Sequence, residues 1–434
     1  MPRLPFSTKL YYGMAALSMT LPDLMVVQWL LVRYVPPDKP HLVPATLFGL
    51  LFLLGRVTEG ATCSLIAHWS DVCQSRWGRR LPFMRLGILP FVMVFFCLFV
   101  PPIGEMHWAN AVYVGILIPT YFILYTTAFT PYLALIPEIT SDLKERVDLT
   151  TAQSIFMVIT NVLFTMAGTV LQQWGWVVLA GAASLLIVLF FLPAATRLRE
   201  GTKHADAAQE PLRYLESVAL ALRNRPCRIA MASISVYWFG LNAIIVIIPH
   251  WTISYLGRSE GDVTKLMIPF VAVNFVFFFV FNALATKLGK YAMMLVTFLG
   301  SGLAMMAFCL VGHLPFGDLF LQSAVVFSMF GAPLAGFMVL PFAVLSDVID
   351  YDAQLTGHRR EAIFIGVAGV CQKIMLGLSV LTVTVVPYLG GNGEPTAYGL
   401  KLMAFLSGLA CIAAFLIFIR YPLREHQGRI RLVN

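Results

Sequence analysis

The feature that most constrains this chain is a series of twelve apolar stretches, each longer than 20 residues. They fall at 10–33, 44–70, 83–103, 109–136, 151–172, 176–196, 228–256, 265–286, 291–312, 318–346, 362–389 and 398–419. An α-helix rises about 1.5 Å per residue, so about 20 apolar residues cross the roughly 30 Å hydrocarbon core of a bilayer. The sequence therefore predicts an all-α integral membrane protein with twelve transmembrane helices.

The distribution of basic residues predicts the orientation of these helices. Of the 434 residues, 59% are hydrophobic and 12% are charged, against about 25% charged in soluble domains. Of the 30 Lys and Arg residues, 23 fall on one side of the predicted membrane and 5 on the other. Basic residues accumulate in cytoplasmic loops, so both termini are expected in the cytoplasm. The net charge of +8 then reflects topology, and no nucleic-acid partner is expected.

The longest polar connector divides the chain into two halves of six helices. We expect an N-terminal half at 1–196, a cytoplasmic linker at 197–227 with a short amphipathic helix at 211–222, and a C-terminal half at 228–434. The halves repeat one another, because PYLALIPEI at 131–139 has the counterpart PFAVLSDVI at 341–349. A weaker echo relates RWGRR at 76–80 to KLGK at 287–290. Internal repeats of this kind are typical of secondary transporters.

Four ionisable residues are predicted near the middle of the membrane. Counting from the helix ends, Asp23, Glu59 and Lys373 lie about 18–21 Å deep, and Arg56 shares a helix face with Glu59. A charge at this depth is costly unless it has a partner or a function. We therefore interpret the four as a substrate or ion site. The alternative is that Arg56–Glu59 is a helix-local ion pair and Lys373 a structural contact.

Further candidates for the same site are polar or aromatic residues on other predicted helices. Aromatic side chains line sugar and lipid cavities, but in membrane helices they also serve in packing. These candidates are Tyr121, Tyr125, Gln153 and Asn242.

A second charged set lies on the connectors of the cytoplasmic side. Acids and bases are interleaved on matching connectors of the two halves, whereas topology alone explains only the bases. We expect ion pairs that close the cytoplasmic side and break as the halves rock. The residues of this predicted gate are Asp71, Arg76, Arg79, Arg80, Glu138, Asp142, Arg146, Asp347, Asp350, Arg359 and Arg360.

The sequence offers no evidence for an enzyme or a metal centre. Seven cysteines occur without a CxxC spacing, so neither a disulfide framework nor a zinc site is indicated. A nucleophile–base set and a phosphate-binding loop are also missing from the sequence. We expect no cofactor, no metal and no catalytic residue. A membrane sensor or assembly factor on a transporter scaffold remains the alternative from another class.

Three segments, found in order along the whole chain, resemble the glycoside–pentoside–hexuronide:cation symporters, the melibiose permease group of the major facilitator superfamily. The first is Asp71 with RWGRRLP at 76–82. The second is PYLALIPEIT at 131–140 with Glu145 and Arg146. The third joins LSDVIDY at 345–351, TGHRRE at 356–361 and Lys373.

This resemblance implies the 6+6 major facilitator fold, alternating access and cation-coupled uptake of a sugar. Its cation site has two acids one turn apart on the second helix and a lysine on the eleventh, so Glu59 and Lys373 match, but Cys63 replaces the second acid. The sugar-binding acids of the family are replaced by Ala15 and Phe129, and its fifth-helix arginine by Ser154. A thiol is a poor ligand for sodium, so the proton is the expected coupling ion.

The resulting expectation is a secondary active transporter of a small organic solute, either sugar-like or amphiphilic. An uncoupled facilitator and a lysolipid-type carrier remain alternatives. We expect a monomer in contact with membrane lipid, located in the plasma membrane, which for a bacterium is the inner membrane.

Overall fold

The computed structural model describes residues 4–140, 142–200, 224–356, 361–391, 393–426 and 429–432. Within these ranges, twelve helices are long and apolar enough to cross a membrane. The predicted helical membrane fold and the predicted number of spanning helices are therefore confirmed. The predicted amphipathic helix at 211–222 lies outside the described residues.

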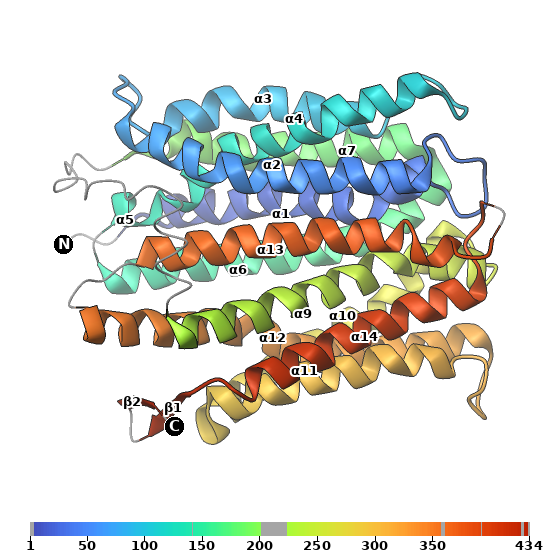
Figure 1. Cartoon of the computed structure of the whole chain (residues 1–434). Helices are drawn as coiled ribbons and strands as arrows, with labels where there is room; N and C mark the ends of the chain where they lie inside the picture. Colours follow the sequence, from blue (N-terminus) through green and yellow to red (C-terminus); the bar gives the residue numbers. More distant parts are fainter. Residues whose placement is uncertain are drawn as a thin grey trace. The chain divides into compact units, whose positions relative to one another are not determined.

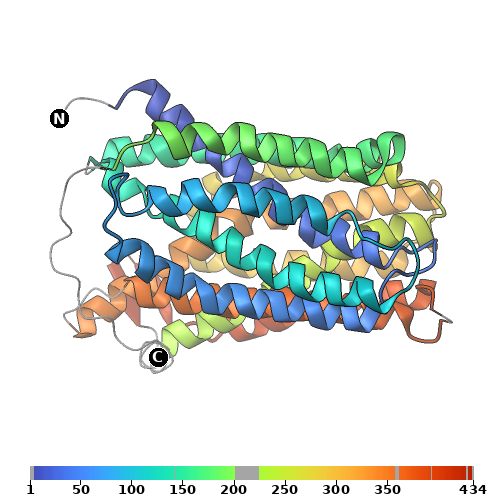
Figure 2. The same cartoon turned by 90° about the horizontal axis from the view of Figure 1, so that it is seen from above.

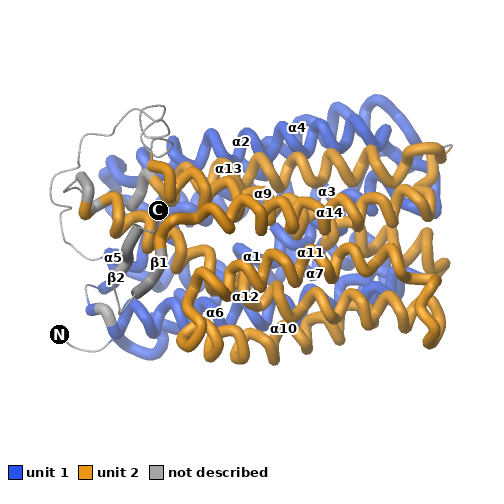
Figure 3. Tube along the Cα trace, turned by 60° about the horizontal axis from the view of Figure 1, so that its bottom comes forward, with its two compact units in different colours: residues 1–207, 259–264 blue, residues 208–258, 265–434 orange. Residues whose placement is uncertain are grey.

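The chain forms two compact units (Figure 3). Unit 1 comprises Met1–Ala207 and Ser259–Thr264, and unit 2 comprises Ala208–Arg258 and Lys265–Asn434. The boundary falls in the long polar connector, except that the short segment Ser259–Thr264 belongs to unit 1.

Unit 1 is built from six long helices and one short one. They are α1 (Phe6–Tyr34), α2 (Ala45–Val72), α3 (Leu81–Leu98), α4 (Trp108–Leu133), α5 (Ile136–Ile139), α6 (Leu143–Thr165) and α7 (Ala167–Arg197). Helix α1 packs against α6 and α7, and α4 packs against both α2 and α3 (Figure 1, Figure 2). The close approach of α2 to α4 depends on Gly55, where a Cβ atom would lie 2.4 Å from Ile118 and 2.8 Å from Phe122.

Unit 2 repeats this packing. Its helices are α9 (Arg225–His250), continued by a π-helical turn at Trp251–Tyr255, α10 (Glu260–Leu288), α11 (Lys290–Met306), α12 (Leu319–Thr356), α13 (Glu361–Val383) and α14 (Ala397–Phe418), with 3₁₀ turns at Ala307–Leu310 and Val386–Tyr388. Helix α9 packs against α13 and α14, just as α1 packs against α6 and α7. Helix α11 packs against α12 and α14.

Two helices differ most from their predicted bounds. The helix predicted at 151–172 begins at Leu143, because Asp142 caps it by accepting a 2.8 Å hydrogen bond from the Lys144 backbone N–H. It ends at Thr165, and the following residues join α7 until Gly175, whose φ of 77° interrupts that helix. Helix α12 continues past the predicted end at 346 to Thr356. The prediction ended where the sequence becomes polar, but the backbone hydrogen bonds of a helix do not require apolar side chains.

The all-α prediction also misses a small sheet after the last helix. Strands β1 (Leu423–His426) and β2 (Arg429–Leu432) pair antiparallel, with Leu423 opposite Leu432. Apolar run length, on which the prediction was based, carries no information about such a polar tail.

Candidate functional site

The guanidinium of Arg56 joins two acids from different helices of unit 1. Its Nη1 donates to Glu59 Oε2 at 2.8 Å, one turn along α2, and its Nη2 donates to Asp23 Oδ1 at 2.9 Å on α1. The Arg56 side chain is 0% exposed and that of Glu59 4%, whereas that of Asp23 is 31% exposed. We call these three residues the central charge cluster. Asp23 is its accessible member.

Aromatic rings surround the buried part of this cluster. The Arg56 guanidinium carbon lies 4.5 Å from the ring centre of Phe122 and 5.5 Å from that of Phe52. Cation–π interactions at these distances stabilise the buried positive charge of Arg56. The Nε of Arg56 is buried and has no hydrogen-bond partner among the described residues. Arg56 is therefore held by its two acids and by the aromatic rings of α2 and α4.

The net charge of the cluster favours the binding of a proton, a cation or a hydrogen-bond donor. Two carboxylates and one guanidinium carry one excess negative charge when both acids are ionised. Binding one proton makes the cluster neutral, and a cation or a hydrogen-bond donor at Asp23 compensates it in part. Helix α1 contains Pro22 directly before Asp23, and proline removes one intrahelical hydrogen bond. The local backbone of α1 is thus loosened beside the accessible acid.

The two tyrosines predicted for the site lie on α4 with different exposure. Tyr121 is fully buried, and its hydroxyl has no hydrogen-bond partner among the described residues. Its ring centre lies 6.1 Å from that of Tyr125, which is only partly buried. Tyr121 therefore acts through packing in this conformation, and Tyr125 is the more accessible of the pair.

Cys63 lies one turn beyond Glu59 on α2 and is exposed. Its Sγ lies 3.8 Å from Thr130 Oγ1 of α4. Gln153 is partly buried on α6. The structure thus places the predicted residues Cys63 and Gln153 in unit 1, but it does not join them to Arg56.

Two predicted site residues belong to unit 2. Asn242 on α9 donates to Ser379 Oγ at 2.6 Å, and this hydrogen bond connects α9 with α13. Lys373 lies partly buried on α13. A role of Lys373 as a countercharge to Glu59 stays a prediction.

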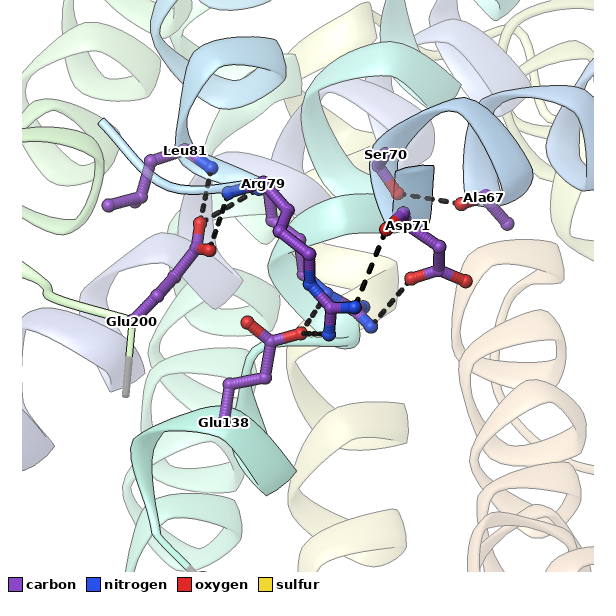
Figure 4. A network of polar contacts seen from close by, with 8 residues as sticks. Ala67, Ser70, Asp71, Arg79, Leu81, Glu138 and Glu200 are labelled. Carbon is purple, nitrogen blue, oxygen red and sulfur yellow. Dashed lines mark hydrogen bonds and ion pairs between the residues drawn. The ribbon is translucent and has the colours of Figure 1, made fainter. Parts of the chain in front are cut away.

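Four of the predicted gate residues of unit 1, Asp71, Arg79, Arg80 and Glu138, form a network at one end of its helices (Figure 4). Glu138 of α5 accepts hydrogen bonds from Arg79 Nη2, at 2.6 Å, and from Arg80 Nε. Arg80 Nη2 also donates to Asp71 Oδ1 at 2.9 Å. Partial burial acts to lower the pKa of Arg79, but the hydrogen bond and charge of Glu138 raise this pKa above its usual value. Arg79 therefore stays charged, and the network connects the end of α2 to α5.

Glu200, which the sequence analysis missed, completes the network. Its carboxylate accepts from the backbone N–H groups of Arg79, Arg80 and Leu81 at 2.7–2.8 Å and so caps the N-terminus of α3 (Figure 4). Gly78 has a φ of 107°, and a Cβ atom there would lie 2.5 Å from the Glu200 carboxyl carbon. Only glycine fits this position. In the sequence, the one indication of this capping role is that Glu200 is an acid directly after the basic residue Arg199.

The remaining gate residues have separate surroundings. In unit 2, Asp347 Oδ1 accepts from Lys290 Nζ at 2.7 Å, and Lys290 is a second residue that the sequence analysis did not assign to the gate. Asp350 is exposed, and Arg359 and Arg360 lie outside the described residues. In unit 1, Arg146 Nε donates to the Thr140 carbonyl at 3.0 Å. The ion pairs described here lie within one unit each, and pairing between the two halves stays a prediction.

Lys9 forms another ion pair that the sequence analysis did not predict. Its Nζ on α1 lies 2.8 Å from Glu145 and 2.5 Å from Asp148, both on α6. This contact ties the start of α1 to the start of α6.

Comparison with known proteins identifies the family. A family model described as MFS/sugar transport protein matches residues 11–425. An uncharacterised symporter of Synechocystis sp. is 23% identical over 88% of this chain and 85% of its own length. An isoprimeverose transporter of Lactiplantibacillus pentosus is 23% identical over 86% of this chain and 78% of its own.

A solved structure supports the same fold. The crystal structure of the nucleoside transporter NupG matches with a TM-score of 0.69 and 12% identity, over 95% of this chain and 99% of that one. At this identity the match concerns the fold alone. Together with the match of the family model over nearly the whole chain, these findings show that the chain is a multi-pass secondary transporter and belongs to the MFS/sugar transport protein family.

Proposed function

We propose that this chain is a symporter that couples the movement of a small, hydroxyl-rich solute of the sugar or glycoside class to that of protons. The observation that carries this proposal is the fully buried cation Arg56, which Asp23 and Glu59 share. The isoprimeverose transporter among the relatives supports a glycoside-type solute.

The proton is proposed to bind at Glu59. This acid is almost entirely buried, so its ionised form depends on the hydrogen bond from Arg56. When Glu59 takes up a proton, Arg56 no longer balances two carboxylates and can pair fully with Asp23. The cluster then becomes neutral, which lowers the energy of moving it through a conformation without water.

The solute is proposed to bind beside Asp23, the accessible acid. A carboxylate accepts hydrogen bonds from sugar hydroxyls, and such bonds to a charged acceptor are stronger than neutral ones. A solute hydroxyl at Asp23 competes with Arg56 for the same oxygens. Arg56 thereby links solute binding at Asp23 to proton binding at Glu59.

Lys373 is proposed to balance the charge of the cluster at another stage of transport, and the ion pairs at the ends of the helices to close the cytoplasmic side. The proposed orientation has both termini in the cytoplasm, and the proposed location is the plasma membrane. A proton is favoured over sodium because Cys63 supplies no oxygen ligand one turn from Glu59.

The test compares two modes of transport in proteoliposomes with Glu59→Gln. Solutes are first selected from glycosides, nucleosides and lysolipids by binding to the parent protein. Glu59→Gln is expected to abolish accumulation driven by a proton gradient and to retain solute exchange. Glu105→Gln, the same chemical change on an exposed connector, is the control and should behave like the parent.

Three results would overturn parts of the proposal. If Glu59→Gln still accumulates solute against a gradient, Glu59 is only a structural partner of Arg56. If the parent protein exchanges solute but never accumulates it under a proton gradient, the chain is an uncoupled facilitator. Selection of lysolipids over glycosides would replace the proposed solute class.

A further inference from the structure

The connector between α2 and α3 contains arginines in two different environments. Arg79 and Arg80 are compensated by Glu138 and Asp71. Arg76 is exposed, and neither it nor Arg85 in the first turn of α3 forms an ion pair with an acid in the described part of the chain. The gate network therefore accounts for only some of the basic residues at this end of unit 1.

Arg76 and Arg85 instead share one aromatic ring. Their guanidinium carbons lie 5.0 Å and 5.3 Å from the ring centre of Trp77. Arg85 is held in this position, because its Nε donates to the Ala195 carbonyl of α7 at 2.6 Å. Two like charges on one ring repel each other. An anion between them would replace this repulsion by two attractive contacts.

The position of Trp77 indicates which kind of anion fits. Trp77 is 38% exposed and lies between the end of α2 at Val72 and the start of α3 at Leu81. These are ends of membrane-spanning helices, so the indole lies at the level where tryptophan side chains meet lipid headgroups. Basic side chains beside the ends of spanning helices attract anionic lipids.

We propose that Arg76, Trp77 and Arg85 form a binding surface for the headgroup of an anionic phospholipid. The phosphate lies between the two guanidinium groups, and the indole contacts the glycerol region of the lipid. A membrane lipid is favoured over a soluble anion because the surface combines two cations with an exposed aromatic ring at the membrane boundary. This lipid is additional to the transported solute, and the inference does not depend on the proposed coupling.

The test measures lipid retention by the full-length protein. The protein is reconstituted in equal amounts of phosphatidylglycerol and phosphatidylcholine, extracted in detergent and examined by native mass spectrometry. The parent protein is expected to retain phosphatidylglycerol in preference to phosphatidylcholine. Arg76→Gln combined with Arg85→Gln should remove this preference, and Trp77→Ala should reduce it. Lys39→Gln, which removes an exposed cation from the connector after α1, should leave it unchanged.

Three results would overturn the inference. They are an unchanged lipid preference in the double variant, an equal loss of preference in Lys39→Gln, and displacement of the retained phosphatidylglycerol by inorganic phosphate, which would indicate a site for soluble anions. If the double variant does not fold, Arg76→Gln alone decides the question, because Arg76 is a surface residue without a structural hydrogen bond in the described chain.

Discussion

The two units share a helix packing scheme but differ in what they bury. In unit 1 the polar centre is charged, with Arg56 between Asp23 and Glu59. Among the described residues of unit 2, two buried polar contacts are neutral, because Asn242 binds Ser379 and the Tyr237 hydroxyl lies 2.7 Å from Ser301 Oγ. The buried acid of unit 2, Asp352, lies near the end of α12 and accepts a 3.3 Å hydrogen bond from Asn224. Neutral hydrogen bonds hold helices together, whereas a buried charge responds to protons and ions. For this reason the proposed proton coupling is placed at the charged centre of unit 1.

At the helix ends the two units are alike again. Unit 1 pairs the α2–α3 connector with Glu138, and unit 2 pairs Lys290 at the start of α11 with Asp347 of α12. The weak sequence echo between 76–80 and 287–290 thus corresponds to equivalent ion pairs. The repeat preserves these pairs at the helix ends and not the charges at the centre.

The largest expected effect comes from removing the central cation. Arg56→Gln removes the guanidinium that two acids share, and breaking a buried ion pair in this way costs about 3–5 kcal/mol. Tyr237→Phe in unit 2 removes one hydrogen bond, worth about 1 kcal/mol. Unfolding in detergent measures both. Equal destabilisation by the two variants would remove the distinction between the units.

The next effect concerns the ion pairs at the helix ends. Asp347→Ala and the double change Arg79→Ala/Arg80→Ala should both favour the state open to the cytoplasm, by about 1–3 kcal/mol. Arg79→Ala alone should act in the same direction but less, because Arg80 still binds Glu138. The measurement is the rate at which a thiol reagent labels a cysteine at position 153 in a protein whose seven native cysteines are serine.

Arg76→Ala is the matched control for this experiment, because Arg76 takes no part in the ion pairs of the described residues. Its labelling rate should equal that of the parent. An identical change in rate for Arg76→Ala and Arg79→Ala would show that overall loop charge, not pairing, sets the equilibrium.

A smaller effect is expected from Glu200→Gln, which keeps the shape of the cap but removes its charge. Loss of a good helix N-cap costs about 0.5–2 kcal/mol, and a neutral amide should lose only part of this. Hydrogen exchange of the backbone amides of Arg79, Arg80 and Leu81 should accelerate, while exchange at the start of α11 in unit 2 should not. Unchanged exchange at these three amides would contradict the capping role.

The smallest effect is expected from sodium. The described residues contain no group of three or more His, Cys, Asp or Glu side chains able to hold a metal ion, and Cys63 offers sulfur where an oxygen would be needed. Replacing sodium by choline at constant pH should leave solute uptake unchanged. A sodium-dependent gain in solute affinity at several pH values would move the coupling from protons to sodium.

The sequence was sufficient for the fold but only for part of the candidate site. The lengths of the apolar stretches predict the twelve helices, because each helix must be long enough to cross a bilayer. The Arg56–Glu59 pair follows from its spacing on one helix. The contact of Arg56 with Asp23 depends on how α1 packs against α2. Counting residues along a helix predicts how deep a residue lies in the membrane, but not which neighbouring helix its side chain faces.

The contacts that the sequence missed are those between distant segments. Glu200 lies more than 100 residues from the amides that it caps, and Lys290 pairs with Asp347, 57 residues later on the next long helix. Sequence composition marks these residues as charged but does not identify their partners. The end of α6 at Thr165 was also missed, because an apolar stretch can be continuous while its helix is not, whereas the break at Gly175 lies in the predicted gap between 172 and 176.

The cap provided by Glu200 has a consequence for the order in which the protein is made. Synthesis proceeds from the N-terminus, and domains fold as their segments become available. The connector between α2 and α3 emerges early, yet its amides receive their acceptor only when residue 200 has been added, after the last helix of unit 1. The residues of the central charge cluster, Asp23, Arg56 and Glu59, precede residue 200 in the sequence. We therefore expect that a nascent chain arrested once residue 200 has left the ribosome already contains a closed network at the start of α3, before the synthesis of unit 2 is complete.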